Sequence, residues 1–280
     1  MNDQEFDYLK QRILALAGID LECYKSQQMR RRLEAFIAAQ GMDTIPFCSV
    51  LARDPGALAK LRDFLTINVT EFFRDREQYQ VLRTVILPKL LRRTDRLNIW
   101  SAGCSRGAEA YSTAMILQEI SPGQAHRTLA TDIDEGVLAV ARKGGPYSPS
   151  DLKNVDRSLL LKYFTKSEED LMVAPAIRRR VEFRKHNLLS DRFEPGFDLI
   201  ICRNVTIYFS DGAKTKLLQG FHSSLKEQGV LFIGATETLL SAPSLGFEWI
   251  GKCFYRKSAS SRLPQAQEAA APLPRAVEGR

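Results

Sequence analysis

The chain has 280 residues, of which 44% are hydrophobic and 26% charged, a composition typical of a water-soluble protein with one large core and a smaller unit. It contains no run of the roughly 18 to 20 apolar residues that a membrane span requires, and its first residues lack the basic and apolar regions of a signal peptide. We therefore expect a cytoplasmic protein without direct membrane insertion, and the formal net charge of +7 favours an acidic partner without identifying it.

The cysteines and histidines argue against a metal site. The five cysteines are an odd number with no Cys-x-x-Cys pair, which also argues against a disulfide framework. The three histidines are scattered and offer no ligand spacing. We expect reduced thiols and no metal centre.

Residues 1–70 are predicted to form a small helical domain. Apolar residues recur there at helical spacing in three segments, separated by Gly18, Gly41 and the turn Asp54-Pro55-Gly56. The three apolar faces are Phe6, Leu9, Ile13 and Leu14; Met29, Leu33, Phe36 and Ile37; and Leu58, Leu61, Phe64 and Leu65.

From residue 97 to 257, strand-like runs alternate with helix-like ones, which predicts a mostly parallel α/β sheet. The segment Phe247–Tyr255 is predicted to add an antiparallel pair of strands at the sheet edge. Residues 146–180 exceed the length of a simple crossover and are expected to be an inserted subdomain, with a small hairpin over a helix. Residues 258–280 lack aromatic residues and are expected to be a disordered tail. The predicted strands are Leu97–Ala102, Thr128–Thr131, Val181–Lys185, Phe197–Cys202 and Val230–Ile233.

The turn after the first predicted strand is a candidate cofactor site. Gly103 and Gly107 give Gly-x-x-x-Gly, which lacks the third glycine of a dinucleotide-binding turn. A cofactor with a ribose but no phosphate, such as S-adenosylmethionine, fits better, with Asp132 at the next strand end accepting hydrogen bonds from the ribose diol. A purely structural strand-turn-helix connection explains the same residues, so both interpretations stay open on this motif alone.

Five motifs in order resemble the bacterial chemotaxis receptor methyltransferases, over about residues 3–257. The motifs are Asn68–Arg74, Ile99–Ser105, Ala130–Asp134, Asn187–Leu189 and Phe197–Phe209. The resemblance implies a Rossmann-like methyltransferase sheet behind a helical docking domain, with residues 71–96 as a linker and helix that close over the cofactor. It implies transfer of a methyl group from S-adenosylmethionine to glutamate side chains on the acidic helices of methyl-accepting chemotaxis receptors, which makes the protein a protein-glutamate O-methyltransferase. Glutamate is already anionic at neutral pH, since its pKa is about 4.3, so no general base is needed.

The resemblance also implies a role for individual residues. Asn68, Thr70 and Arg74 would lie over the cofactor, and Gly103 would let the backbone approach it. We further hypothesise that Arg74 and Tyr208 position the incoming glutamate as the catalytic residues, because a guanidinium can hold a carboxylate in a fixed plane and a phenol can donate one hydrogen bond to it. The other implied cofactor contacts are Glu109 at the amino-acid part, Asp132 at the ribose, Asn187 and Leu188 at the adenine, and Arg203 and Asn204 in the remaining wall.

Each of these residues has a simpler explanation. Asn68 and Thr70 are residue types that cap a following helix, and Arg74 has acidic neighbours, Asp75 and Glu77, with which it could pair. Glu109 could be a solvated carboxylate in the first turn of a helix, and Tyr208 a core aromatic residue.

Two basic clusters are candidate docking surfaces. Arg30, Arg31 and Arg32 resemble the basic helix by which the family docks on its receptors, although a solvated helix face explains them too. The role of the second cluster, Arg178–Arg180 with Arg184 and Lys185, stays open.

The chain departs from the family pattern at three places. Arg106, Ala108 and Ala110 replace the usual threonine, glutamate and proline, and an arginine here could either point outward or repel a cationic sulfonium. Gly234–Glu237 lacks the usual histidine but keeps the carboxylate. Thr165–Leu171 lacks glycine, which predicts an enzyme that does not bind a receptor's C-terminal pentapeptide.

Three rival functions differ in class. The altered turn would suit a non-catalytic cofactor-binding regulatory module. A nucleic-acid methyltransferase is disfavoured because the chain has Cys202–Val205 where such enzymes carry an Asn-Pro-Pro-aromatic motif. A nicotinamide-dependent oxidoreductase is disfavoured by the missing glycine. A monomer is expected, because no apolar stripe is left over for a homo-oligomer interface.

Overall fold

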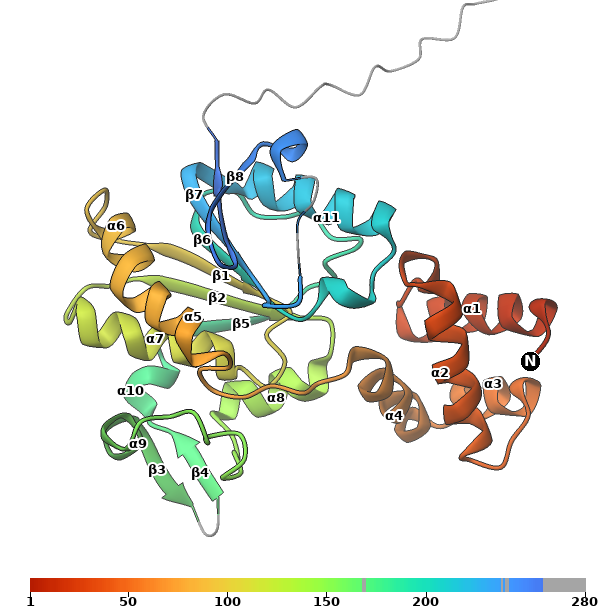
Figure 1. The fold of residues 1–280 in the computed structure, drawn as a ribbon. Helices are drawn as coiled ribbons and strands as arrows, with labels where there is room; N and C mark the ends of the chain where they lie inside the picture. Colours follow the sequence, from red (N-terminus) through yellow and green to blue (C-terminus); the bar gives the residue numbers. More distant parts are fainter. Residues whose placement is uncertain (168–169, 238, 240–241, 259–280) are drawn as a thin grey trace, which may run out of the picture.

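A helical unit precedes a seven-stranded α/β domain in this protein, whose computed structural model describes residues 1–167, 170–237, 239 and 242–258 (Figure 1). The tail expected at 258–280 lies outside the described residues, apart from Ser258. None of the described helices combines the length and the apolar character that crossing a membrane would require.

The helical unit is built around a core of side chains at helical spacing, including Leu9, Leu33 and Phe47, none of which is exposed. Its first helix begins with a reciprocal capping box between Asn2 and Glu5 and ends at a left-handed glycine. The elements are α1 (Asp3–Ala17), the 3-10 turn η1 (Leu21–Cys23), α2 (Ser26–Ala38), α3 (Thr44–Arg53) and α4 (Pro55–Thr66).

A long helical stretch connects this unit to the sheet. It starts as α5 (Arg76–Val81), widens to a π-helical turn η2 (Leu82–Ile86) and ends as α6 (Leu87–Leu91). Its apolar side chains join the core of the sheet domain.

The sheet has the strand order β5-β2-β1-β6-β7-β9-β8 and confirms the predicted fold class. The first five strands of this order are parallel, and β9 runs antiparallel to both β7 and β8, as predicted for the edge. Every residue of the central strand β6 is buried, as expected for a parallel strand covered on both faces. The strands are β1 (Asn98–Ala102), β2 (Arg127–Asp132), β5 (Val181–Lys185), β6 (Phe197–Cys202), β7 (Leu225–Ile233), β8 (Phe247–Gly251) and β9 (Phe254–Lys257), and the helical elements between them are α7 (Ala108–Ile120), α8 (Glu135–Lys143), η3 (Thr206–Tyr208), α11 (Asp211–Ser224) and η4 (Pro243–Leu245).

An inserted subdomain separates α8 from β5, and it contains the predicted hairpin. Strands β3 and β4 pair antiparallel, and Tyr147 extends this pairing through two backbone hydrogen bonds with Leu171. In Figure 1 the hairpin lies at the lower left and the helical unit at the right, so the two project from different parts of the sheet domain. The elements of the insertion are α9 (Arg157–Tyr163), β3 (Phe164–Ser167), β4 (Asp170–Val173) and α10 (Pro175–Arg178).

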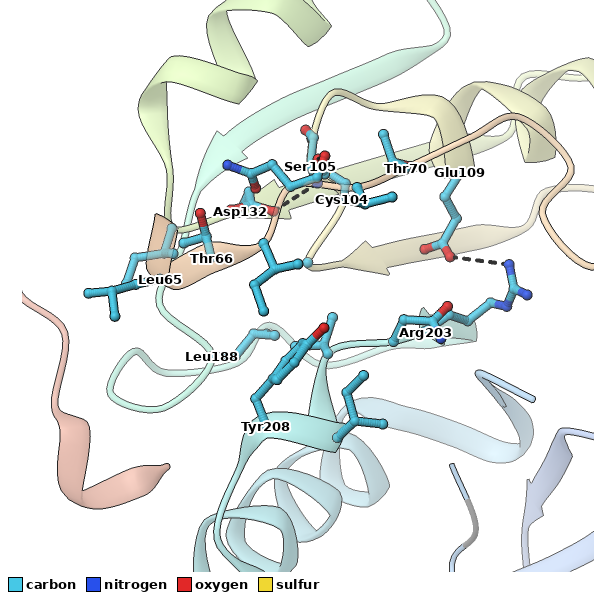
Figure 2. Close-up of a pocket in the computed structure, with 18 of the residues that line it drawn as sticks. Leu65, Thr66, Thr70, Cys104, Ser105, Glu109, Asp132, Leu188, Arg203 and Tyr208 are labelled. Atoms are coloured by element: carbon cyan, nitrogen blue, oxygen red, sulfur yellow. Dashed lines mark hydrogen bonds and ion pairs between the residues drawn. The ribbon is translucent and has the colours of Figure 1, made fainter. Parts of the chain in front are cut away.

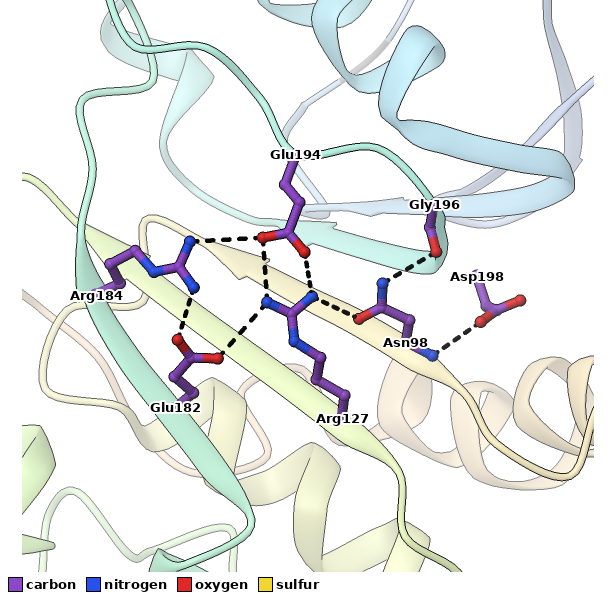
Figure 3. A network of polar contacts seen from close by, with 7 residues as sticks. All are labelled: Asn98, Arg127, Glu182, Arg184, Glu194, Gly196 and Asp198. Atoms are coloured by element: carbon purple, nitrogen blue, oxygen red, sulfur yellow. Dashed lines mark hydrogen bonds and ion pairs between the residues drawn. The ribbon is translucent and has the colours of Figure 1, made fainter.

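A polar network joins neighbouring strands where β1 and β2 begin (Figure 3). Arg127 donates to Glu194 at 2.5 and 3.1 Å, and Arg184 pairs with Glu182 at 2.6 Å. The backbone N–H of Asn98 donates to Asp198 at 2.8 Å. Arg184 of the second basic cluster is therefore occupied within the protein.

Two further members of that cluster are also used internally. Arg178 donates to the carbonyl of Lys143 at 2.9 Å, and Arg180 donates to the carbonyl of Gln124 at 3.2 Å. These contacts join the inserted subdomain to the sheet domain, a structural task that needs no external partner.

The core of the helical unit predicts a large difference between two substitutions in one helix, α3. Phe47→Ala removes a fully buried ring and should lower the free energy of unfolding by about 3 to 5 kcal/mol. Ile45→Ala, at a side chain that is 60% exposed, should change it by less than about 0.5 kcal/mol. Urea denaturation followed by circular dichroism measures both, and equal midpoints would contradict this account of the core.

Candidate functional site

A cavity of about 180 Å³ lies between the helical unit and the carboxyl ends of the parallel strands (Figure 2). This is the edge of an open α/β sheet at which ligands usually bind. The helical unit contributes Tyr24 and the end of α4, so neither unit alone encloses the cavity. Its walls come from the end of α4 and the linker residues that follow it (65–71 and Arg74), the turn 103–105 with Glu109, the ends of β2 and β5, and the segment 203–209.

The turn after β1 is held by the end of β2. Gly103 has a φ of 82°, and a Cβ there would lie 2.6 Å from a methyl group of Val205, so only glycine fits. The backbone N–H groups of Gly103 and Cys104 both donate to the carbonyl of Thr131, at 2.8 and 2.9 Å. The turn therefore brings its backbone against the cavity without a side chain in the way.

Asp132 is buried at the end of β2 and faces the cavity. One carboxylate oxygen accepts a hydrogen bond from the Ser105 N–H at 2.8 Å, and the other accepts one from the Asp134 N–H at 3.0 Å. Burial raises the pKa of the Asp132 carboxyl, and these backbone hydrogen bonds oppose that rise. Each oxygen keeps acceptor capacity for a ligand hydroxyl.

Glu109 carries the second carboxylate of the cavity, in the first turn of α7, and its side chain is 12% exposed. It accepts a hydrogen bond from the Ser101 hydroxyl at 2.7 Å, and its other oxygen lies 4.0 Å from the Arg203 guanidinium. Burial raises the pKa of Glu109 to about 7, although Arg203 and Ser101 lower it. The solvated carboxylate is thus the wrong explanation of Glu109, and a cation entering the cavity would favour its charged form.

Arg203 stands at the end of β6 and is turned toward the linker. One of its amino groups donates to the carbonyl of Arg74 at 3.0 Å and to the Asp75 carboxylate at 2.5 Å. Its guanidinium carbon lies 4.8 Å from the ring centre of Phe232 and 5.4 Å from that of Tyr79. The structure thus places Arg203 in the wall of the cavity, where its hydrogen bonds hold Arg74 and Asp75 in position.

The sequence patterns assigned no role to Glu237, although it organises the segment after β6. Its buried carboxylate accepts four hydrogen bonds: from the N–H groups of Asn204, Thr206 and Gly234 and from the Thr206 hydroxyl, at 2.7 to 2.8 Å. These bonds hold Asn204 at a φ of 59°, a left-handed conformation that asparagine tolerates. The signal was a carboxylate just after a predicted parallel strand, but two of its partners, Asn204 and Thr206, lie about thirty residues away in the sequence.

The linker places Asn68, Thr70 and Arg74 along the cavity. The Asn68 amide donates to Asp134 at 2.9 Å. The residue that precedes the next helix, α5, is Asp75, so the explanation of Asn68 and Thr70 as caps of that helix is wrong. Asp75 and Glu77 pair instead with Arg203 and Lys252, so pairing does not explain Arg74. Within the described part of the chain, the Arg74 guanidinium has no hydrogen-bond or ion-pair partner.

The remaining implied residues lie where the two units meet. Asn187 donates to the carbonyl of Gly18 in the helical unit at 3.3 Å, and its side-chain oxygen accepts from the Leu189 N–H. Leu188 lines the cavity beside it. The carbonyl of Tyr208 accepts a hydrogen bond from the Lys25 N–H at 3.0 Å, while its partly exposed ring lines the cavity. Tyr208 therefore packs against the core of the sheet domain and also lines the cavity, so the core-aromatic explanation accounts for only part of its environment.

The three arginines of α2 differ in what they contact. Arg30 pairs with Asp3 at 2.7 Å and with Glu34 at 3.4 Å. Arg32 is half-buried, donates to the carbonyl of Phe64 at 2.6 Å and lies 5.9 Å from the ring centre of Tyr208. Arg31 is exposed, and no described residue pairs with its side chain. Of the three, Arg31 is the most available to a partner.

Arg106 points away from the cavity. Its guanidinium pairs with Asp151 at 2.6 Å, and the Tyr147 hydroxyl donates to its carbonyl. The structure supports an Arg106 side chain that points outward, and not one that would repel a cationic sulfonium, because Arg106 does not line the cavity. Ala108 and Ala110 are fully buried in α7.

Comparison with known proteins gives concordant matches over nearly the whole chain. The description "CheR methyltransferase, all-alpha domain" matches residues 4–66, and "CheR methyltransferase, SAM binding domain" matches residues 68–250. A chemotaxis protein methyltransferase of Listeria monocytogenes is 34% identical over 258 residues, covering 91% of this chain and 98% of that protein. Chemotaxis protein methyltransferase 1 of Pseudomonas aeruginosa is 35% identical over 252 residues, covering 85% of this chain and 92% of that protein.

The four hydrogen bonds to Glu237 predict that its charge stabilises the fold. Glu237→Gln places an amide N–H₂ against backbone N–H donors and should lower the free energy of unfolding by about 2 kcal/mol. Glu248→Gln, which removes only a surface pair with Arg256, should change it by less than about 0.5 kcal/mol. Urea denaturation measures both variants, and a Glu237→Gln protein as stable as the wild type would refute this role.

Proposed function

The chain belongs to the CheR methyltransferase family, and on this premise we propose that it methylates glutamate side chains on chemoreceptor cytoplasmic helices. The products are glutamyl methyl esters, which adapt the sensory response in chemotaxis, and S-adenosylhomocysteine. The cofactor is S-adenosylmethionine. The observation that carries the proposal is that one cavity holds the largely enclosed carboxylate of Glu109 and the guanidinium of Arg74, which has no hydrogen-bond or ion-pair partner among the described residues. Each of these groups is opposite in charge to one reactant: Glu109 to the cationic cofactor, and Arg74 to the anionic glutamate.

The residues of the cavity fit this cofactor. Glu109 lacks a full counter-charge, since Arg203 is 4.0 Å away, and an α-ammonium group would supply one. Asp132 keeps acceptor capacity for a ribose diol. Gly103 leaves room for close approach. We propose that Asn68, Thr70, Arg74, Asn187, Leu188, Arg203 and Asn204 complete the cofactor site, with Arg203 and Asn204 acting through the wall that they stabilise.

The chemistry requires placement and dehydration. S-adenosylmethionine supplies a methyl group on a sulfonium, and the glutamate carboxylate is ionised at neutral pH, so no residue has to remove a proton. We propose that Arg74 holds the carboxylate and that the Tyr208 hydroxyl donates one hydrogen bond to it. The linker and Tyr24 of the helical unit would exclude water from the reaction.

We propose that the helical unit docks on the acidic methylation helices through the exposed face of α2, with Arg31 in direct contact. Arg30 and Arg32 would support this face, since both are already engaged within the protein. The proposed setting is the cytoplasm, and the enzyme would act as a monomer.

The test of the function is transfer of radiolabelled methyl from S-adenosylmethionine to receptor-bearing membranes of the source organism. Label on a receptor band that mild alkali releases as methanol is the expected result, because methyl esters hydrolyse in alkali. Cofactor binding without any transfer would instead favour a non-catalytic regulatory module.

We expect Arg74→Ala to lower kcat by about 100-fold or more, since it removes the group that orients the carboxylate. Because the wild-type guanidinium has no partner among the described residues, the melting temperature should stay unchanged. Arg76→Ala, which removes a surface pair with Asp156, is the matched control and should keep kcat within about twofold. Full activity in Arg74→Ala would remove this residue from the mechanism.

The pKa of Glu109 predicts that cofactor affinity depends on pH. Because the cofactor's ammonium group favours the charged carboxylate, affinity should be full above pH 8 and fall as the pH drops through about 7. At pH 6 about one molecule in eleven has an ionised Glu109, so the Kd should rise about tenfold. Calorimetry at pH 6 and pH 8 measures it, and Glu109→Gln should bind weakly with little pH dependence. A wild-type Kd that does not change over this range would count against the role of Glu109.

We further propose that receptor recognition needs no C-terminal pentapeptide, because the hairpin segment Thr165–Leu171 contains no glycine. Calorimetry with a receptor tail peptide should then show no binding. Tight binding would contradict this proposal.

A further inference from the structure

The segment 72–75 of the linker adopts an unusual backbone. Phe73 has a φ of 50° and Asp75 a φ of 61°, and these two residues flank Arg74. Left-handed conformations are unfavourable for a bulky residue such as phenylalanine and persist only where the surroundings impose them. Something must therefore hold this segment in place.

Four contacts from three different elements hold the segment. The Phe72 N–H donates to the carbonyl of Asp151 in the inserted subdomain at 2.9 Å. The Phe73 N–H donates to the Ser112 hydroxyl of α7 at 3.0 Å. The Arg74 carbonyl and the Asp75 carboxylate both accept hydrogen bonds from Arg203 at the end of β6, at 3.0 and 2.5 Å. Every residue of the segment is thus fastened.

The anchors of these contacts are themselves rigid. Ser112 is fully buried, and its hydroxyl donates back to the Ala108 carbonyl at 2.7 Å, which orients its lone pairs toward Phe73. The Arg203 side chain is 2% exposed and lies against the rings of Phe232 and Tyr79. A displacement of the segment would therefore break its hydrogen bonds to the buried Ser112 hydroxyl and to the buried Arg203 guanidinium.

The Arg74 side chain is the exception in this arrangement. Within the described residues it has no hydrogen-bond partner, it lines the cavity, and its charge lowers the pKa of Glu109. The contacts described above hold each residue of the segment 72–75. The Arg74 guanidinium, which has no partner among the described residues, is therefore held in a position to bind a ligand in the cavity.

We propose that Asp75 and Ser112 are positioning residues that act through Arg74. The Asp75–Arg203 ion pair and the Ser112 hydroxyl set the strained backbone from which Arg74 reaches the substrate carboxylate. This inference rests on the proposed function, since it requires Arg74 to orient the methyl acceptor.

A conservative variant tests each of the two proposed positioning residues, Asp75 and Ser112. Asp75→Asn removes the charge but keeps the shape, and asparagine tolerates a positive φ. Ser112→Ala removes the acceptor of the Phe73 N–H and tests the same segment from α7. The matched control is Glu77→Gln, which neutralises a carboxylate two residues further along the chain that pairs with Lys252 at the surface.

The experiment is a double-mutant cycle on kcat in the methyl-transfer assay with receptor-bearing membranes. Asp75→Asn and Ser112→Ala should each lower kcat by about tenfold in the wild-type background, because small misplacements of an orienting group are costly. Each should change kcat by less than about twofold in the Arg74→Ala background, where no guanidinium remains to be placed. Glu77→Gln should keep kcat within about twofold in both backgrounds.

The outcomes separate this inference from the proposed function. No transfer of label by the wild-type protein would overturn the function itself. Normal kcat in both Asp75→Asn and Ser112→Ala, with Arg74→Ala inactive, would overturn the inference and leave the function intact. Effects that persist undiminished in the Arg74→Ala background would also overturn it, because a general structural role does not depend on the Arg74 side chain.

Discussion

The strand ends at the cavity leave backbone N–H groups that no neighbouring strand can pair, and buried carboxylates accept their hydrogen bonds. Asp132 accepts from the turn after β1 and from the turn after its own strand, and Glu237 accepts from the segments that follow the paired strands β6 and β7. Unpaired buried N–H groups would cost about 1 to 3 kcal/mol each, so these two side chains determine which loop conformations are possible. These two carboxylates hold the backbone of Ser105 after β1 and the left-handed Asn204 after β6.

Arg203 connects this scaffold to the linker that closes the cavity. A guanidinium with 2% side-chain exposure needs compensation, and it has the Asp75 carboxylate, the Arg74 carbonyl and two aromatic faces. Burial raises the pKa of Glu109, and Arg203 at 4.0 Å opposes that rise only in part. The cavity can therefore bind a cationic group near Glu109. Arg74, which has no hydrogen-bond or ion-pair partner among the described residues, can bind an anionic group. The helical unit completes the enclosure through Tyr24 and through backbone hydrogen bonds to Tyr208 and Ser210.

Much of the fold could be predicted from short-range patterns. Apolar residues at helical spacing indicated α1, α2 and α4 of the first unit, although α3 was not among the predicted segments. A near-continuous apolar run indicated the central strand β6, because burial on both faces demands apolar residues at almost every position. The order of the five motifs indicated the protein family and, through it, the cofactor S-adenosylmethionine. The individual contacts were less predictable: Arg106 has an unusual side chain for its turn, and its harmlessness depends on Asp151, 45 residues later in the chain.

The sequence by itself determined the fold class and the cofactor class, and it named several of the residues that line the cavity, since these depend on residue type, spacing and motif order. Only the tertiary structure decided which of those residues face a ligand and which hold the wall. Arg74 and Arg203 look alike in the sequence. Among the described residues, the Arg74 guanidinium has no partner, whereas the Arg203 guanidinium is buried and paired with Asp75. The physical reason is that a charged side chain takes its role from its partners, and here these partners come from elements far apart in the chain.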